Sequence, residues 1–326
     1  MAASMPTLVF IHEPEKACLE RLLGQGFAQE RAAEITSYLA QSTDLAPEFP
    51  LFSQACAARG LVFLPVELDG AADVLAQQDP ASTLVWTITD GIAYFRGSAG
   101  PALARLFGLR IIGSDDSLYA LCQDKFRSGA VLRALGLPVP AAGLARDGEW
   151  IVPPPAAPNG YFVKPNRLGA KIGIWPDSHC RSLEEARDLS RRIFAAYRAE
   201  AAGIFFVDSG GDFQTMADSL ALYGDTGAAA KAAGSYVEPE LRPVAGSQPG
   251  AAREIRDIAA RLINGLGLRD VFSADLRVEE DGTVHLIEFE VCPGLPCFDF
   301  RGYCRAQWNL SLHEAVAETA RRRLAP

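Results

Sequence analysis

The sequence predicts a mixed α/β protein. Apolar runs typical of buried strands alternate with segments of helical periodicity, the runs at residues 6–12, 61–68 and 84–88 and the helical segments at residues 29–41 and 101–107. This alternation favours a mainly parallel sheet covered by helices in the N-terminal third. The pattern changes near the C-terminus, where residues 272–291 read as two strands joined by a tight turn and therefore predict an antiparallel hairpin.

The loop after the first predicted strand bears on the kind of ligand. It reads Glu13-Pro14-Glu15 and contains no glycine. A dinucleotide-binding loop needs glycines at this place, because the backbone must approach a pyrophosphate closely. A dinucleotide-binding site of that type is therefore disfavoured.

The middle of the chain predicts further helices and a loop rich in proline. Residues 115–135 read as one helix that ends at Gly136, with prolines beyond it as stop signals. The proline-rich stretch 151–158 leads to a short strand at 161–163. Two amphipathic helices are expected at residues 182–197 and 251–266.

The predicted hairpin near the C-terminus has a register that can be counted. Its centre is Asp281-Gly282, a pair typical of two-residue turns in which both residues have positive φ. A two-residue turn places Asp275 opposite Glu288, and Ser273 opposite Glu290. Every cross-strand pair then follows from the same count. Alternation places six side chains on each face: Ser273, Asp275, Arg277, Leu286, Glu288 and Glu290 on one, and Ala274, Leu276, Val278, His285, Ile287 and Phe289 on the other.

The charged face of the hairpin predicts a metal site. Opposed carboxylates about 5 Å apart repel by roughly 3 kcal/mol at an effective dielectric constant of about 20, so folding alone gives no reason to place them there. Mg²⁺ gives a reason, since it prefers oxygen ligands. Asp275, Glu288 and Glu290 are the candidate ligands. The alternative is a solvated charged face of an exposed hairpin.

Composition excludes several classes of function. The chain has 326 residues, 49% of them hydrophobic, which is enough for two or three subdomains. Its net charge of -9 argues against nucleic acid, which requires a basic surface. No apolar run approaches the roughly 20 residues of a membrane span, and no secretion signal is visible at the N-terminus. Seven cysteines without paired spacing fit a reducing, cytoplasmic location and offer no zinc motif.

Two lysines suggest a phosphate ligand. Lys164 follows a predicted strand and precedes a loop containing Gly169 and Gly173, and Lys125 follows Gln123 and Asp124. Ammonium groups and exposed backbone N–H groups suit phosphate oxygens. Taken alone, Lys164 could equally be a surface lysine. Together with the acidic hairpin, the two lysines make a nucleoside triphosphate the simplest ligand.

These motifs together resemble a known family. Five stretches carry the resemblance, in order: Gln123-Asp-Lys125, Gly136-Leu-Pro-Val-Pro140, Phe162-Val-Lys-Pro165, Ser273-Ala-Asp-Leu-Arg277 and Ile287-Glu-Phe-Glu-Val-Cys-Pro-Gly-Leu295. They resemble the ATP-grasp ligases of the D-alanine–D-alanine ligase type, over about residues 84–326 and most strongly at the C-terminal motif. Stretches 88–97, 208–213 and 290–293 look more like the branch that includes the ligases of mycosporine-like amino acid synthesis.

The resemblance implies a fold and a set of roles. The expected domains are a Rossmann-like N-terminal domain preceding the ATP-grasp fold at 1–113, a small lid domain at 114–205, and a C-terminal α+β domain at 206–326. Lys125 and Lys164 would contact the phosphates of ATP, while the three carboxylates of the hairpin would hold two Mg²⁺ ions. The N–H of Gly294 would face the reacting substrate oxygen, and a homodimer is possible.

Further nucleotide contacts are implied in loops. Gly169 and Lys171 belong to the expected phosphate loop, and Lys231 ends a Gly- and Ala-rich segment from Asp225 that could close over ATP or be a passive surface loop. Glu200 occupies the place of a ribose contact, although its surroundings read more readily as the end of a helix.

The chain also departs from the family pattern. The arginine that steadies the tetrahedral intermediate in the family falls at Ser273, so Arg277 or Arg301 is the candidate replacement, and each could instead form an ordinary ion pair. Arg301 is also a candidate clamp for a substrate carboxylate. The serine that helps to bind D-alanine aligns with Ala170, and the N-terminal glutamate motif is not recognisable. Two D-alanines are therefore not the expected substrates.

The predicted activity follows from the resemblance. It is the ATP- and Mg²⁺-dependent joining of an oxygen-activated acid to an amine, expected to be an amino acid, in the biosynthesis of a peptide-like compound or natural product, with release of ADP and phosphate. Two rivals are kept: a non-catalytic relative that binds a nucleotide or metabolite, and a phosphotransferase that stops at the phosphorylated intermediate.

Overall fold

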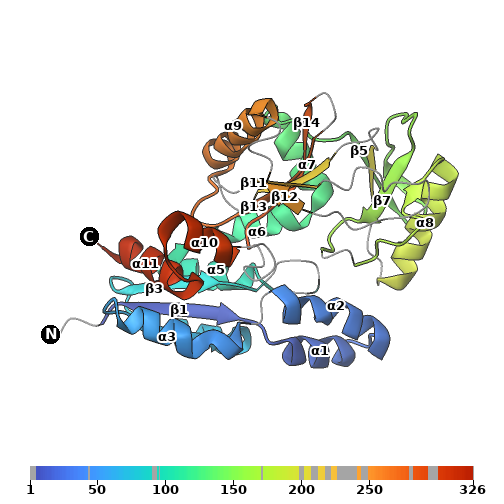
Figure 1. Cartoon of the computed structure of the whole chain (residues 1–326). Helices are drawn as coiled ribbons and strands as arrows, with labels where there is room; N and C mark the ends of the chain where they lie inside the picture. Colours follow the sequence, from blue (N-terminus) through green and yellow to red (C-terminus); the bar gives the residue numbers. More distant parts are fainter. Residues whose placement is uncertain are drawn as a thin grey trace. The chain divides into compact units, whose positions relative to one another are not determined.

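The structure of the protein is a computed structural model, shown in Figure 1. It describes residues 5–42, 45–89, 94, 96–169, 172–197, 202–206, 212–216, 222–225, 241–243, 249–278, 282–292 and 300–325. The contacts divide the chain into two compact units. Unit 1 comprises Met1–Ala120, Leu268–Phe272 and Val291–Pro326, and unit 2 comprises Leu121–Gly267 and Ser273–Glu290. The finer division into three domains stays a prediction.

Unit 1 contains the expected parallel sheet. Its strands are β1 (Thr7–His12), β2 (Val62–Glu67), β3 (Thr83–Thr87) and β4 (Arg110–Ile112), in the order β2-β1-β3-β4. All three pairings are parallel. The last five residues of β1 are buried, as the apolar run predicts for a central strand covered on both faces. The predicted α/β class is confirmed.

Helices supply the two covers of this sheet. The helices of unit 1 are α1 (Glu15–Gly24), α2 (Gln29–Ser42), α3 (Phe49–Ala57), α4 (Ala71–Leu75), α5 (Ala99–Leu106), α10 (Phe300–Trp308) and α11 (Leu312–Leu324), with 3-10 turns η1 (Ala46–Glu48) and η2 (Leu68–Gly70). Those that contact the sheet are α3, α4, α5 and α11. One face of β1 packs Val9 and Ile11 into a core with α4 and α5. The other face places Phe10 against Phe49 and Phe52 of α3. Both faces are apolar because alternate side chains of β1 point to opposite sides.

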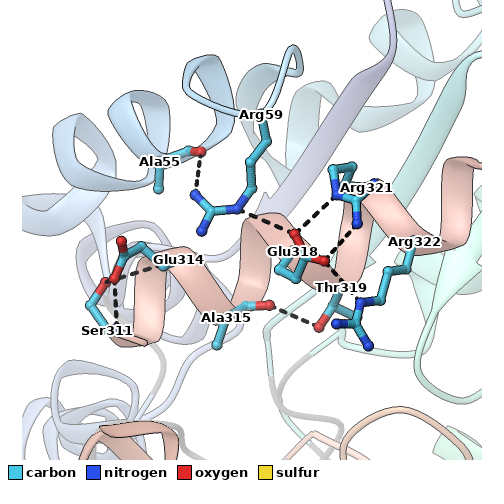
Figure 2. A network of polar contacts seen from close by, with 9 residues as sticks. All are labelled: Ala55, Arg59, Ser311, Glu314, Ala315, Glu318, Thr319, Arg321 and Arg322. Atoms are coloured by element: carbon cyan, nitrogen blue, oxygen red, sulfur yellow. Dashed lines mark hydrogen bonds and ion pairs between the residues drawn. The ribbon is translucent and has the colours of Figure 1, made fainter. Parts of the chain in front are cut away.

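The last helix of the chain packs on α3, as Figure 2 shows. Ser311 begins α11 with a capping box, in which its hydroxyl accepts from the N–H of Glu314 and the Glu314 carboxylate accepts from the N–H of Ser311. Arg59, just beyond α3, donates to the carbonyl oxygen of Ala55 at 3.1 Å, and its Nε lies 3.5 Å from a carboxylate oxygen of Glu318. This contact joins the two ends of the chain within unit 1.

A second link within unit 1 involves Arg301. Its guanidinium group in α10 donates to both carboxylate oxygens of Glu48, and Nε2 of His313 lies 2.6 Å from one of them. The His313 ring also packs edge-on against Phe52 at 4.6 Å between centroids. The hydrogen bond from Arg301, together with that from His313, outweighs the effect of burial and lowers the pKa of Glu48. The ion-pair alternative for Arg301 is therefore the arrangement seen.

Unit 2 contains two antiparallel sheets. The smaller one has the order β6-β5-β9-β7-β8, from β5 (Ala142–Arg146), β6 (Glu149–Val152), β7 (Tyr161–Pro165), β8 (His179–Cys180) and β9 (Ala202–Phe206), with α8 (Leu183–Ala196) packed against it. Asp147 and Gly148 join β5 to β6 with φ of 51° and 76°. These positive values are those of a tight hairpin turn.

The second sheet of unit 2 carries the acidic hairpin. Its order is β12-β11-β10-β13-β14, from β10 (Asp212–Met216), β11 (Leu222–Asp225), β12 (Leu241–Pro243), β13 (Ser273–Val278) and β14 (Val284–Glu290). The helices of unit 2 that contact β14 are α7 (Lys125–Ala134) and α9 (Pro249–Leu266). A shorter helix, α6 (Asp116–Gln123), precedes α7.

The register of the hairpin is partly as predicted. Asp275 pairs with Glu288 and Ser273 pairs with Glu290, which confirms the count at these positions. After Asp275 the register shifts by one, so that Leu276 pairs with Leu286. The extra residue is Ile287, and a β-bulge of this kind reverses the alternation beyond it.

The bulge corrects the predicted faces. Leu286 was placed on the charged face and His285 on the apolar face, and both placements are wrong, since Leu286 is fully buried and His285 is half-buried. The predicted turn lies partly outside the described residues. Gly282 within it has a φ of 89°, as a tight turn requires.

Replacing Ser311 with alanine should lower the free energy of unfolding by about 1 kcal/mol, because the N-terminal N–H groups of α11 lose their side-chain acceptor. Urea denaturation measures the change. Ser37→Ala is the matched control, since the hydroxyl of this exposed serine donates to the carbonyl oxygen of Glu34 within a helix and caps nothing. Equal effects of the two substitutions would contradict the capping role.

The ion pair at Glu48 predicts a pH dependence of stability. A carboxyl whose pKa is lowered by folding stabilises the folded state above its unfolded pKa, and this contribution disappears as the pH falls through the folded value. The difference in unfolding free energy between the wild type and Glu48→Gln should therefore shrink between about pH 6 and about pH 3. Urea denaturation across this range tests it, and a difference that stays constant or grows would contradict the assignment.

Candidate functional site

The candidate site lies within unit 2, and it begins at a break between two helices. Residues 115–135 were predicted as one helix, but the structure ends α6 at Gln123 and starts α7 at Lys125. Asp124 between them has an extended backbone, and its side chain accepts from the N–H of Arg127 at 3.0 Å. The one-helix prediction is wrong because aspartate competes for this backbone N–H as a cap. The break places Lys125 in the first turn of α7.

Asn166 fixes Lys125 from the neighbouring loop. Its amide nitrogen donates to Asp124 at 2.9 Å, and its side-chain oxygen accepts from the N–H of Phe126 at 2.9 Å. The backbone oxygen of Asn166 accepts from the N–H of Lys125 at 3.1 Å. Sequence reasoning did not identify Asp124 and Asn166 as positioning residues. The available signal was Asp124 itself, because an aspartate can begin a helix by accepting from the N–H of the residue three positions later, here Arg127.

The two predicted lysines converge on one carboxylate. Lys164, from β7, donates from its ammonium group to Oε2 of Glu288 at 3.2 Å. The Nζ of Lys125 lies 3.6 Å from the same oxygen and donates to the carbonyl oxygen of Leu168 at 2.7 Å. Both lysines are buried, with 7% and 8% of their surfaces exposed. We call Lys125, Lys164, Asp275 and Glu288 the ion quartet.

The electrostatics of the ion quartet differ between its two carboxyl groups. Burial, followed by the neighbouring Glu288, raises the pKa of Asp275 to about 7, although the two lysines act in the opposite direction. Burial also favours the neutral form of Glu288, but the ammonium groups of Lys125 and Lys164 outweigh it and lower the pKa to about 2. Burial lowers the pKa of Lys164. Within the ion quartet, the negative charge of Glu288 therefore balances the two lysines, whereas the anionic form of Asp275 is less well stabilised.

The oxygen donors fit a divalent cation. Asp275 and Glu288 are directly paired across β13 and β14, which brings two carboxyl groups together. Carboxylate oxygens in this arrangement suit a hard divalent cation. Glu290 follows Glu288 by two residues on β14 and pairs with Ser273. In the part of the chain that the structure describes, no three His, Cys, Asp or Glu side chains gather as a metal site. The three-ligand, two-ion site stays a prediction.

The other predicted site residues are only partly described. Gly169 is in the loop after Lys164, where its carbonyl oxygen accepts from the N–H of Ile172 at 3.0 Å. The loop also needs Gly173, because a Cβ there would lie 2.5 Å from Pro165. Arg277 lies in β13, and its side chain is not described. Four further predicted residues lie outside the described residues, and their roles stay predictions: Lys171, Glu200, Lys231 and Gly294.

Arg301 does not belong to the ion quartet. It lies in unit 1, where Glu48 occupies its guanidinium group. The six described cysteines are buried thiols that form no disulfide with one another. Among the described helices, none combines the length and the apolar character needed to cross a membrane.

Known proteins resemble the chain in sequence and in fold. No family model matches it. A putative D-alanine–D-lactate ligase of Streptomyces coelicolor is 25% identical over 239 residues, which cover 68% of this chain and 66% of that protein. The vancomycin/teicoplanin A-type resistance protein VanA of Enterococcus faecium is 24% identical over 229 residues, 66% of this chain and 65% of VanA. The matches thus span slightly less than two thirds of each relative.

The crystal structure of D-alanyl-alanine synthetase A from Vibrio cholerae has the same fold. It superposes with a TM-score of 0.61 and 15% sequence identity, covering 99% of each chain. The fold agreement extends over the whole length, whereas the sequence agreement is limited to about two thirds of it. These findings do not confirm the mycosporine branch, which stays a prediction. The chain therefore has the ATP-grasp fold of the D-alanine–D-alanine ligases, and it is similar in sequence to a putative D-alanine–D-lactate ligase and to VanA.

Proposed function

We propose that the chain is an ADP-forming ligase that uses ATP and Mg²⁺ to activate a carboxylate and join it to an amine. The observation that carries this proposal is the ion quartet, in which two buried ammonium groups and two opposed carboxyl groups meet. Burying two ammonium groups beside two partly buried carboxyl groups costs free energy that folding does not recover unless the geometry is excellent. A site for a charged ligand accounts for that arrangement.

The ion quartet offers two kinds of group to a triphosphate. Lys125 and Lys164 now contact Glu288. When ATP binds, they would donate to the phosphate oxygens instead, because these carry more negative charge than one carboxylate. Asp275 and Glu288, with Glu290 as the further candidate, would hold Mg²⁺. When bound, Mg²⁺ neutralises charge on the phosphate oxygens. The present contacts of Lys164 and Lys125 with Glu288 keep both lysines in place before ATP arrives.

The reaction requires positioning more than a protein nucleophile. An oxygen of the substrate carboxylate attacks the γ-phosphorus of ATP, the bond to the bridging oxygen breaks, and ADP leaves. The amine nitrogen then attacks the carbon of the acyl phosphate, phosphate departs with the oxygen, and the amine loses a proton. The lysines hold the phosphates in line, and their charge stabilises the transferred group. The proposed reaction needs no covalent intermediate between a side chain and the substrate.

The relatives, and the positions where this chain differs from the family pattern, indicate the substrate class. The relatives are named for ligation of D-alanine to D-lactate and for vancomycin/teicoplanin resistance, which supports small substrates. Ser273 occupies the place of the family arginine, so the substrates need not be those of the relatives. We infer that the substrates are a small acid, or a compound with an equivalent enolic oxygen, and an amine of the amino-acid class, joined in the biosynthesis of a peptide-like compound or natural product. Cytoplasmic location and homodimer formation remain predictions.

Glu288→Gln should lower the rate of ADP release by about 10²-fold or more, because it removes both the partner of the two lysines and a metal ligand. The rate is measured with ATP, Mg²⁺ and a mixture of acids and amines. Glu254→Gln, at an exposed position of α9, is the matched control. Release at the full rate would refute the assignment. If a nucleotide stabilises the chain against heat but no ADP is released, the chain is instead a non-catalytic binding protein.

Asp275→Asn should raise the Mg²⁺ concentration needed for half-maximal ADP release about tenfold or more, since an amide oxygen is a weaker ligand than a carboxylate. Asp257→Asn on the exposed side of α9 is the control. A titration of Mg²⁺ at fixed ATP measures the shift. If both variants need the same Mg²⁺ concentration as the wild type, Asp275 is not a metal ligand.

A further inference from the structure

The amino-terminal edge of the parallel sheet in unit 1 carries arginines at both of its ends. All pairings in this sheet are parallel, so the first residues of its strands lie along one edge. Arg59 lies three residues before β2, and Arg110 is the first residue of β4. Nη2 of Arg110 donates to the carbonyl oxygen of Ala81, in the loop before β3, at 2.8 Å. Because β2 and β4 are the outer strands, the two arginines are separated by roughly 14 Å, or three strand spacings.

Helix α11 bridges the two ends of this edge. A carboxylate oxygen of Glu318 in α11 lies 3.5 Å from Nε of Arg59. Further along the helix, the backbone oxygen of Arg323 accepts from Nη1 of Arg110 at 3.1 Å. Nη2 of Arg323 donates to the carbonyl oxygen of Ile111 at 3.3 Å. The last turns of α11 therefore run from the β2 side of the sheet to its β4 side.

Three arginines share the single carboxylate of Glu318, as Figure 2 shows. Besides Arg59, they are Arg321, which donates from Nη2 at 2.7 Å, and Arg322, which donates from Nε at 2.9 Å. The side chains of Arg321 and Arg322 are 49% and 74% exposed. One carboxylate thus leaves most of this guanidinium charge facing solvent.

Only two further carboxylates were found near these arginines in the described part of unit 1. Oδ2 of Asp270 lies 3.7 Å from Nη2 of Arg323. The side chain of Asp79, in the loop before β3, accepts from the N–H of Ala81. Five guanidinium groups therefore meet three carboxylates, on a chain whose net charge is -9. We call the five the arginine edge: Arg59, Arg110, Arg321, Arg322 and Arg323.

The fold explains only part of the arginine edge. Arginines in the last turn of a helix interact favourably with its carbonyl end, which accounts for the three in α11. Arg59 and Arg110 come from other segments, and like charges within about 10 Å repel at ordinary salt. Exposed ion pairs contribute little to stability, so folding gives no reason to gather the remaining positive charge here.

The side chains along this edge suit a protein partner. A guanidinium group binds a carboxylate with two parallel hydrogen bonds, and arginine is enriched at the centres of protein interfaces. Two large apolar side chains, Met5 before β1 and Val62 at the start of β2, are 60% and 38% exposed at the same edge. Nucleic acid is disfavoured, since the overall negative charge of the chain repels it.

We propose that the arginine edge is a docking surface for an acidic segment of a partner protein. The carboxylates of this segment pair with Arg110, Arg321 and Arg322, and its apolar side chains cover Met5 and Val62. Docking here leaves the opposite edge of the sheet open, which is where small ligands of open α/β sheets bind. The inference is independent of the ligase activity, because neither ATP nor Mg²⁺ takes part in the contact.

Fluorescence anisotropy of the full chain with a labelled peptide of glutamate and leucine, at about 0.15 M salt, tests the proposal. This peptide should bind. The same peptide with glutamine in place of glutamate should not bind, and a single-stranded oligonucleotide of equal charge should bind more weakly. Arg322→Glu should weaken binding of the acidic peptide about tenfold, because it reverses an exposed charge. Arg256→Glu is the matched control, since it makes the same change at an exposed position of α9.

Glu318→Gln gives the opposite result and removes the carboxylate that competes for three arginines. The acidic peptide should bind this variant several-fold more tightly than the wild type. Because Glu318 also links α11 to Arg59, circular dichroism checks that the variant is folded. Asp79→Asn removes a second carboxylate, from an exposed loop, and should tighten binding in the same direction.

Four results would overturn the proposal. They are no binding of the acidic peptide, equal binding of its glutamine version or of the oligonucleotide, equal effects of Arg322→Glu and Arg256→Glu, and no gain in affinity from either Glu318→Gln or Asp79→Asn. Sedimentation velocity of the chain alone provides a further check. If the chain forms a dimer that Arg322→Glu abolishes, a second copy occupies the arginine edge and the proposal of an acidic partner is wrong.

Discussion

The convergence of Lys125 and Lys164 on one carboxylate oxygen of Glu288 is the interaction on which the functional account depends. It joins the first turn of α7, the end of β7 and the strand β14 within unit 2. The two ammonium groups are buried, so they need an anionic partner, and the loss of Glu288 would leave both without their common anion. The local structure serves this arrangement: Asp124 caps α7, and Asn166 ties the cap to the loop that follows Lys164.

The two units solve a similar electrostatic problem in different ways. In unit 2, Glu288 balances two lysines, and the carboxyl group opposite, Asp275, is left with a raised pKa. In unit 1, the buried Glu13 carboxylate balances two arginines, Arg21 and Arg96, whose side chains are 20% and 34% exposed. Lysine suits compact phosphate charge, so the residue types of the ion quartet agree with a nucleotide in unit 2.

Much of this was predictable from sequence because it is local. The parallel strands follow from continuous apolar runs, and the Asp275–Glu288 pair follows from counting along two strands. The bulge at Ile287 was not predictable, since an alternating pattern does not reveal an extra residue until the strands are paired. The break at Asp124 was missed because the apolar spacing continues across it. The ion-pair partner of Arg301 could not be predicted from the sequence, because Glu48 lies 253 residues away in the chain.

A crystal structure of the chain with Mg²⁺ and a non-hydrolysable ATP analogue tests the central claim most directly. The account predicts phosphate oxygens within hydrogen-bond distance of the Nζ atoms of Lys125 and Lys164, and Mg²⁺ bound to carboxylate oxygens of Asp275 and Glu288. A nucleotide bound elsewhere, with both lysines still paired to Glu288, would contradict it.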